Sequence, residues 1–380
     1  MADRIPYGRQ SVDESDIEAV AEILRGDFLT TGPAVQHFEE SLAGMTGAGH
    51  AVAVNSGTSA IHAMYFAAGI GEGDEIVTSP LTFAATANAA LYLGAGVRFA
   101  DVRDDTGTID VACAEAAMTE RTRAIVAIDY AGHPADYDAL QDVARRRGVA
   151  VLADAAHSLG ATYRDQKVGT LALASALSFH PVKPITTAEG GAVVTSDDGL
   201  AARAARFRTH GVTRDRDLML ADPGPWFYEM HDLGFNYRLT DVQAALGTSQ
   251  LHRLGRFLDR RRAIAGRYHE ALADIETLRL PTMTSDVESG WHLYVIRTRD
   301  TLRRRPLFDW LIAQGLGVQV HYIPVYQHPY YQRLGYRPGL CPVAERFYEG
   351  AISIPIFPGM SDRDVDRVID ILHRAARELL

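Results

Sequence analysis

The sequence predicts an α/β protein with a large αβα domain at residues 1–250 and a smaller α+β domain at residues 251–380. In the first part, short apolar runs alternate with amphipathic helical patterns, which is typical of a mostly parallel sheet covered by helices. After about residue 250, a long Arg-rich helical pattern begins, and only one strand and two helices are predicted beyond it. The chain has 380 residues and is 47% hydrophobic, so it can bury a substantial core.

The elements of the large domain follow from apolar spacing. Ile17, Val20, Ala21 and Leu24 recur at the spacing of one helix face, and Gly26 suits the end of that helix. A further helix is expected to follow the turn at residues 55–59. Short apolar runs predict strands at residues 51–54, 75–79, 97–102, 124–130, 149–154, 175–179 and 192–196.

The smaller domain is expected to begin with one long helix at residues 250–273. A strand at residues 291–298 follows, then a helix at residues 305–318 and a closing helix from residue 362 onward.

Charge and cysteine content exclude several classes of protein. The formal net charge of −10 disfavours broad binding to nucleic acid or to anionic membranes, which requires a dense basic surface. Cys113 and Cys341 form no CxxC pair or Cys/His cluster, so no metal site or disulfide framework is predicted. No apolar stretch has membrane length and the first ten residues contain no apolar signal segment, so we expect a cytoplasmic protein.

The turn "NSGTS" at residues 55–59 joins a strand to a helix. Gly57 and Thr58 would therefore lie at a helix N-terminus, where free N–H groups and the helix dipole favour an anion such as phosphate. The same Ser and Thr residues are also preferred caps, so a simple cap explains the turn equally well.

A carboxylate follows the apolar strand that ends in "VLADAAH". Asp154 would lie at the carboxyl end of that strand, where open α/β sheets bind ligands, with His157 three residues further on. An Asp at this position can equally cap the next helix.

Lysine is almost absent from the chain, which makes its two occurrences informative. Lys167 and Lys183 are the only lysines, and the other 36 basic residues are arginines. Lys167 lies in the polar turn "YRDQKVG", where exposure is expected. Lys183 lies between Pro181 and Pro184, on a loop that the prolines stiffen. Because lysine, unlike arginine, can lose its proton and attack a carbonyl, Lys183 is the candidate nucleophile.

Together these segments supply what pyridoxal 5′-phosphate (PLP) needs. A lysine can bond to the aldehyde, an acid can keep the pyridine nitrogen protonated, and a helix start can hold the phosphate. Phe83, in "SPLTFAAT", offers a flat ring for stacking.

The sequence resembles the DegT/StrS-type sugar aminotransferases, which are PLP enzymes of fold-type I. The resemblance covers nearly the whole chain, and it rests on "IPYGRQ", "FLTTGP", "NSGTSA", "ADAAH", "SFHPVKPITTAEGG", "GFNYRLTDVQAALG", "HYIPVYQHPYY" and "SIPIFPGM". Within the family, "HPVKPITT", "RTHGVTRD" and "HYIPVYQHPYY" are most similar to the aminotransferases of pseudaminic acid biosynthesis. Ala153 departs from the family pattern, because many relatives have Glu there.

The resemblance implies roles for individual residues. Lys183 matches the Schiff-base lysine and proton shuttle, Asp154 the partner of the pyridine nitrogen, and His157 a neighbour of the ring. It further implies cofactor contacts by Gly57, Thr58, Phe83 and Ser178, with Asn236 donated by a second subunit, and substrate contacts by Tyr7, Arg238, His321 and Tyr322.

The resemblance therefore implies a homodimer with shared active sites that binds a nucleotide sugar and L-glutamate. The expected reaction is amination of the C4 keto group of a nucleotide-linked 4-keto-6-deoxy sugar, most closely a UDP-linked N-acetylhexosamine. The same chemistry on another nucleotide ketosugar or on a cyclitol ketone remains an alternative. A non-catalytic PLP-binding regulator is a second alternative, although the chain shows no basic DNA-binding segment.

Overall fold

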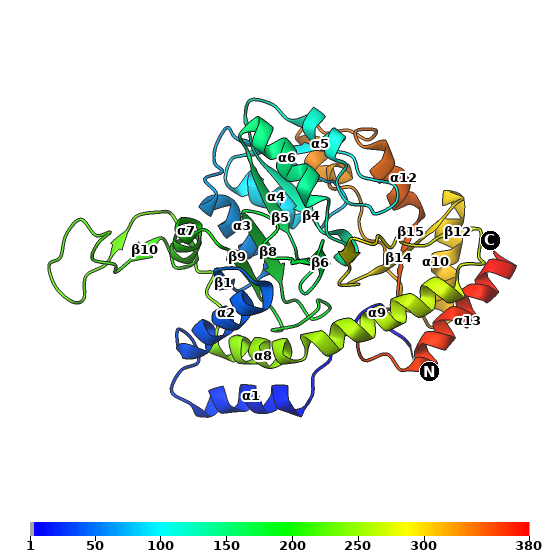
Figure 1. Cartoon of the computed structure of the whole chain (residues 1–380), viewed down its shortest axis with the longest axis horizontal. Helices are drawn as coiled ribbons and strands as arrows, with labels where there is room; N and C mark the ends of the chain where they lie inside the picture. The colour runs from blue at the N-terminus through cyan, green and yellow to red at the C-terminus, as the bar shows by residue number, and fades with distance from the viewer. Residues whose placement is uncertain (1–3, 380) are drawn as a thin grey trace.

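The computed structural model describes residues 4–379, and a seven-stranded sheet forms its centre (Figure 1). All neighbouring strands are parallel except β9, which runs antiparallel to both of its neighbours. In spatial order the strands are β1 (His50–Val54), β9 (Gly191–Thr195), β8 (Ala174–Ser178), β5 (Ala150–Asp154), β4 (Thr122–Ile128), β2 (Glu75–Thr78) and β3 (Gly96–Phe99). The predicted α/β class with a mostly parallel sheet is confirmed.

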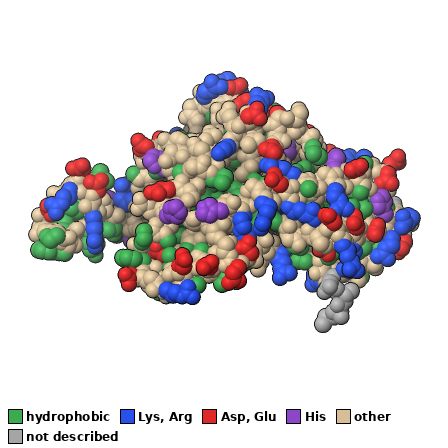
Figure 2. All heavy atoms as spheres, turned by 60° about the horizontal axis from the view of Figure 1, so that its bottom comes forward, with side chains coloured by type: hydrophobic (Ala, Val, Ile, Leu, Met, Phe, Trp, Pro, Cys, Tyr) green, Lys and Arg blue, Asp and Glu red, His purple; other side chains and the backbone are tan. Residues whose placement is uncertain are grey.

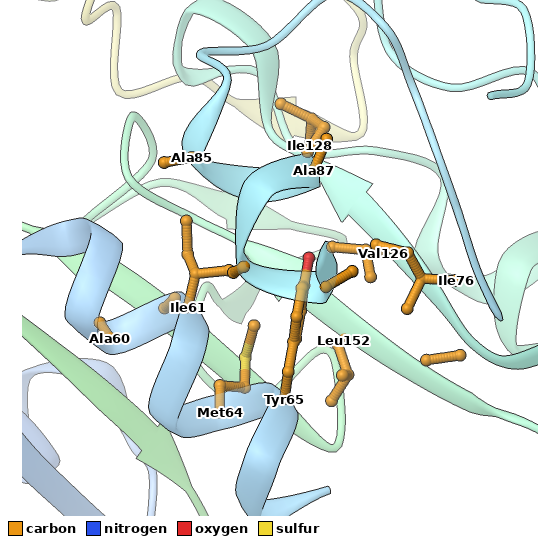
Figure 3. Close-up of a cluster of buried hydrophobic side chains, with 14 of the residues drawn as sticks. Ala60, Ile61, Met64, Tyr65, Ile76, Ala85, Ala87, Val126, Ile128 and Leu152 are labelled. Carbon is orange, nitrogen blue, oxygen red and sulfur yellow. The ribbon is translucent and has the colours of Figure 1, made fainter. Parts of the chain in front are cut away.

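Helices cover both faces of this sheet, and successive residues of a strand contribute to opposite faces. In β4, Val126 packs into the cluster on one face and Ile125 into the cluster on the other. Figure 3 shows the first cluster, with Ile61, Met64 and Tyr65 of one helix against Val126 and Leu152 of the sheet. That face carries α3 (Gly57–Ala67), α4 (Ala85–Tyr92) and α7 (Asp198–Arg208), and the other carries α2 (Pro33–Thr46), α5 (Val111–Ala117), α6 (Tyr137–Arg147) and α8 (Asp241–His252).

The C-terminal part has its own small sheet and core. The sheet consists of β12 (Leu278–Arg279), β14 (Tyr294–Thr298) and β15 (Ala351–Ile354). Its core also contains Ile5, which pairs with Leu316, so the N-terminal segment packs against the C-terminal part of the chain. The helices α9 (Leu254–Ala271), α10 (Arg304–Ala313) and α13 (Asp362–Glu378) contribute to this core. The helices α11 (Pro329–Arg333) and α12 (Pro342–Gly350) instead pack into the cluster that also holds α3 and α4. The domain boundary at residue 250 stays a prediction.

Two small strand groups complete the described fold. The hairpin β6 (Thr162–Tyr163) and β7 (Gln166–Lys167) pairs with β13 (Val287–Glu288), and Lys167 is exposed on it as expected. The strands β10 (Val212–Thr213) and β11 (Glu229–Met230) form the base of a segment that extends away from the body, at the left of Figure 1.

One sequence interpretation needs correction. The helix expected at residues 250–273 is not continuous, because Arg253 has non-helical dihedrals and separates α8 from α9. The first helix, α1 (Glu14–Arg25), forms as predicted, but its apolar face is not buried in this chain. Ile17 is 54% and Leu24 61% exposed, whereas Asp16 is buried against α8.

Among residues 4–379, no helix combines the length and the apolar character that crossing a membrane requires.

Candidate active site

A cavity of about 460 Å³ opens at the carboxyl edge of the central sheet. Its walls come from the ends of β5 and β8, the start of α3 and the turn before α4. The C-terminal part adds a wall at residues 292, 321 and 322. This is the edge at which open α/β sheets bind ligands, because the strands end there and the connecting loops converge.

Lys183 lines the cavity from the loop between β8 and β9. The antiparallel pairing of these strands returns the chain to the same edge, and Phe179 closes the loop by donating its N–H to the Gly190 carbonyl at 2.9 Å. Burial lowers the pKa of the Lys183 amine to about 8, although the negative charge of Asp154 opposes the shift. At neutral pH part of the Lys183 amine is therefore uncharged and can act as a nucleophile or a base.

Asp154 ends β5 and faces the same cavity, as the sequence predicts. One carboxylate oxygen accepts the Thr86 hydroxyl at 2.6 Å, and the other accepts the Ala156 N–H at 3.2 Å. Burial raises the pKa of Asp154, whereas these two donors and the charge of Lys183 lower it. Hydrogen bonds to both carboxylate oxygens therefore fix the orientation of the Asp154 side chain.

The start of α3 forms the third wall. Ser56 caps the helix by accepting the Ser59 N–H at 3.1 Å, which leaves Gly57 and Thr58 as the first helical residues. Their N–H groups have no acceptor within the helix, and they lie at its positive end. A Cβ on Gly57 would lie 2.9 Å from the Ser178 Cβ, so only glycine permits this close approach.

Aromatic and imidazole rings line the rest of the cavity. His157 Nε2 lies 3.1 Å from the Tyr322 hydroxyl, and the Phe83 ring centroid lies 6.4 Å from that of Tyr322. Phe83 is 64% exposed, so its ring has free area on the cavity side. Tyr7 and His321 also lie here, with ring centroids 5.5 Å apart. Burial lowers the pKa of His321 to about 4, so its ring is neutral.

His292 belongs to the cavity, but the sequence analysis missed it. Its ring centroid lies 4.3 Å from that of His157, and burial lowers the pKa of both imidazoles. The residue lies two positions before β14, 135 residues after His157 in the chain. A single histidine before an apolar strand carries no pattern from which this contact could be found.

The structure does not bring Asn236 and Arg238 into this cavity. Asn236 is exposed, and its carbonyl accepts the Asn55 side-chain N–H at 3.3 Å. Arg238 lines a separate hollow of about 260 Å³ together with Glu39 and Arg208. The other predicted site residues all line the first cavity: Tyr7, Gly57, Thr58, Phe83, Asp154, His157, Ser178, Lys183, His321 and Tyr322.

The residues that are present fit PLP. Lys183 supplies a partly uncharged amine, Asp154 a carboxylate, α3 and Ser178 an anion cradle, and Phe83 a flat ring. His157 Nδ1 is buried without a protein partner, which leaves it available to a bound group. Over residues 4–379 no cluster of three or more His, Cys, Asp or Glu side chains could hold a metal ion.

The sequence profile of the DegT/DnrJ/EryC1/StrS aminotransferase family matches residues 10–373. Among named relatives, the spore coat polysaccharide biosynthesis protein SpsC of Bacillus subtilis is 40% identical over 371 residues, which cover 96% of this chain and 95% of SpsC. The UDP-4-amino-4,6-dideoxy-N-acetyl-beta-L-altrosamine transaminase of Campylobacter jejuni is 39% identical over 373 residues, covering 97% of this chain and 96% of the relative.

Solved structures agree with these matches. Helicobacter pylori PseC, an aminotransferase of pseudaminic acid biosynthesis, superposes with a TM-score of 0.92 at 34% identity and covers 98% of this chain and 99% of its own. The PLP form of the sugar aminotransferase Spr1654 from Streptococcus pneumoniae superposes with a TM-score of 0.93 at 29% identity, covering 99% of this chain and all of its own.

Proposed function

The chain belongs to the DegT/DnrJ/EryC1/StrS aminotransferase family and is a PLP-dependent sugar aminotransferase, and we propose that it aminates C4 of a UDP-linked 4-keto-6-deoxy-N-acetylhexosamine with L-glutamate as donor. The observation that carries the chemistry is Lys183, one of only two lysines, which lies half-buried in the sheet-edge cavity that Asp154 also lines. The choice of sugar is supported by the Campylobacter jejuni relative, which aligns with 97% of this chain.

We assign the following roles to the residues of the cavity. When bound, PLP supplies an aldehyde for exchange of amines and a ring that delocalises electrons from the substrate carbon. Lys183, uncharged in part at neutral pH, removes and returns the proton at the substrate carbon. Asp154 holds a proton on the ring nitrogen, and Phe83 restricts the tilt of the ring. The helix start at Gly57 and Thr58, with Ser178, binds the phosphate.

We also infer that two copies share each site. A nucleotide diphosphate requires cationic contacts, yet no arginine is found among the described residues that line the cavity. Arg238 lies outside it, half-buried in the separate hollow, and we propose that it serves the site of a second copy. The segment between β10 and β11 also presents Leu220 and Trp226 to solvent at 92% and 70% exposure, and Figure 2 shows it as a lobe apart from the body. Leu233, which follows β11, is 81% exposed. Apolar side chains this exposed are expected to be covered by a partner.

The substrate is tested by offering nucleotide sugars to the aminated protein. The protein is first converted with L-glutamate, and UDP-linked and dTDP-linked 4-ketosugars are then added separately. We expect an amino sugar by mass spectrometry, and return of the absorbance of the PLP form, with the UDP-linked 4-keto-6-deoxy-N-acetyl sugar alone. A product from a different ketone only would keep the chemistry and overturn this choice of sugar.

SpsC supports a second candidate, because it is as similar to this chain as the Campylobacter jejuni transaminase and is named for a spore coat polysaccharide. The alternative substrate is another nucleotide ketosugar destined for a polysaccharide, and the dTDP-linked arm of the same experiment detects it.

Site sharing is tested by complementation between two inactive variants. Lys183→Ala removes the reactive amine, and Arg238→Ala removes the cation offered to the partner. If sites are shared, mixing the two variants under conditions of subunit exchange produces dimers with one intact site, and activity returns to about a quarter of the wild-type value. Activity that stays at the level of the separate variants would contradict the shared site.

A further inference from the structure

A chain of two buried hydroxyl groups ends on Asp154. Thr86 Oγ1 lies 2.6 Å from Asp154 Oδ2, and Thr82 Oγ1 lies 2.9 Å from Thr86 Oγ1. Thr82 and Thr86 are 4% and 0% exposed, so water does not compete for these contacts. The sequence offered no sign of this arrangement, because both residues lie within an ordinary turn and helix start.

The direction of the chain follows from counting protons. A hydroxyl has one proton, and the short contact with the carboxylate uses that of Thr86. The alternative acceptor of Thr86, the Phe83 carbonyl, is 3.4 Å away. Thr86 must therefore accept the proton of Thr82, and both hydroxyl dipoles point toward Asp154.

Neighbouring elements fix the position of this chain. The Tyr65 hydroxyl of α3 donates to the Thr86 carbonyl at 3.1 Å, and Figure 3 shows this ring directed toward α4. Tyr331, from the C-terminal part, donates to Asn88 Oδ1 of the same helix at 2.7 Å. Phe83 lies between the two threonines in sequence, so one turn carries both the stacking ring and the hydroxyl donors.

We propose that Thr86 is a positioning residue for Asp154: its hydroxyl, aligned by Thr82, keeps the carboxylate ionised and directed toward the ring nitrogen of the cofactor. This inference rests on the proposed function only in requiring that PLP occupies the cavity. Hydrogen bonds to a charged carboxylate favour the charged form, and here they oppose the cost of burial. A carboxylate that became neutral would no longer hold a proton on the ring nitrogen.

The test replaces hydroxyl groups one at a time. Thr86→Val keeps the side-chain shape and removes the donor, Thr86→Ser keeps the donor, and Thr82→Val removes only the outer hydroxyl. Thr78→Val is the matched control, because the Thr78 hydroxyl is equally buried but donates to the Val126 carbonyl at 2.9 Å.

Two measurements distinguish positioning from a general loss of packing. The first is the dissociation constant of PLP from each holoenzyme. The second is the nitrogen-15 chemical shift of PLP labelled at its ring nitrogen, followed from pH 5 to pH 9. Other titratable groups interact electrostatically with Asp154, so variants are compared with the wild type at each pH; these groups are Lys183, Asp129, Tyr65, Tyr137 and Tyr322.

We expect Thr86→Val to weaken PLP binding by about ten- to a hundredfold and to shift the ring-nitrogen signal toward the unprotonated position. Thr86→Ser and Thr78→Val should remain within about threefold of the wild type, and Thr82→Val should fall between. An unchanged ring-nitrogen signal in Thr86→Val would overturn the proposal. If Thr86→Val does not fold, a ring-nitrogen signal in Thr82→Val that equals the wild-type signal would overturn the proposal instead. Neither measurement uses a nucleotide sugar, so a wrong assignment of the sugar would leave this result unaffected.

Discussion

The reactivity of Lys183 in the cofactor-free protein can be calculated from its surroundings. Burial lowers the pKa of its amine from 10.5 to about 8. At pH 7 about one amine in ten is then uncharged, which is about 300 times the fraction expected of an ordinary lysine. Lys183 should therefore react with an acylating reagent far faster at neutral pH than a solvent-exposed lysine would.

The assay is trace labelling with acetic anhydride from pH 6 to pH 11, with the acetylated peptides measured by mass spectrometry. The scarcity of lysine makes the result easy to assign, because Lys167 is the only other lysine and lies exposed on β7. We expect half-maximal labelling of Lys183 near pH 8.

Asp154→Asn tests the cause of the shift. The negative charge of Asp154 favours the protonated amine, so its removal should lower the midpoint of Lys183 labelling further. Asp198→Asn is the control, because that carboxylate is exposed and pairs with His50. A wild-type midpoint at or above pH 10, or a midpoint that rises in Asp154→Asn, would refute the reasoning.

Three further substitutions test other parts of the structure. Gly57→Ala should weaken PLP binding about tenfold, because the new Cβ would lie 2.9 Å from the Ser178 Cβ; titration of the apoenzyme with PLP measures this, and unchanged affinity would contradict it. Lys183→Met should raise the free energy of unfolding of the apoenzyme by about 3 kcal/mol at pH 7, because the protonated amine no longer has to be desolvated. That gain should shrink above pH 8, as the wild-type amine loses its proton more readily folded than unfolded; denaturant titrations at pH 7 and pH 10 check the sign. Gly247→Ala should destabilise the protein by about 1–3 kcal/mol despite the better helix propensity of Ala, because its Cβ would lie 2.6 Å from the Phe38 ring, and a rise in unfolding midpoint would contradict this.

The sequence predicts those site residues whose chemistry is visible in one segment. Lys183 stands out because lysine is rare and prolines flank it, and Asp154 because it ends an apolar strand. The contacts that hold them are not predictable in this way. Thr86 meets Asp154 across 68 residues, and His292 reaches His157 only through the packing of β14 beside the main sheet.

The fold was predictable to a similar extent. Strands buried on both faces appear as continuous apolar runs, so the predicted ranges fall close to those of the structure. The break at Arg253 was not visible, because helix propensity continues through it and the turn is set by packing. The apolar pattern of α1 was identified, but Ile17 and Leu24 lie exposed. The polar residues Ser15 and Asp16 instead make the hydrogen bonds to α8.

The antiparallel pairing of β9 has a consequence for how the protein folds. Ser178 and Gly191 pair across a loop of twelve residues, whereas His50 and Thr195 of the edge pair are separated by well over a hundred. Because short loops close at a lower entropic cost, the β8–β9 hairpin should form early and recruit β1 late. Pulse-labelled hydrogen exchange should therefore protect the amides of β8 before those of β1. The loop that carries Lys183 would then be among the first parts of the site to form. The start of α3, which follows β1 and is proposed to bind the phosphate, would be among the last.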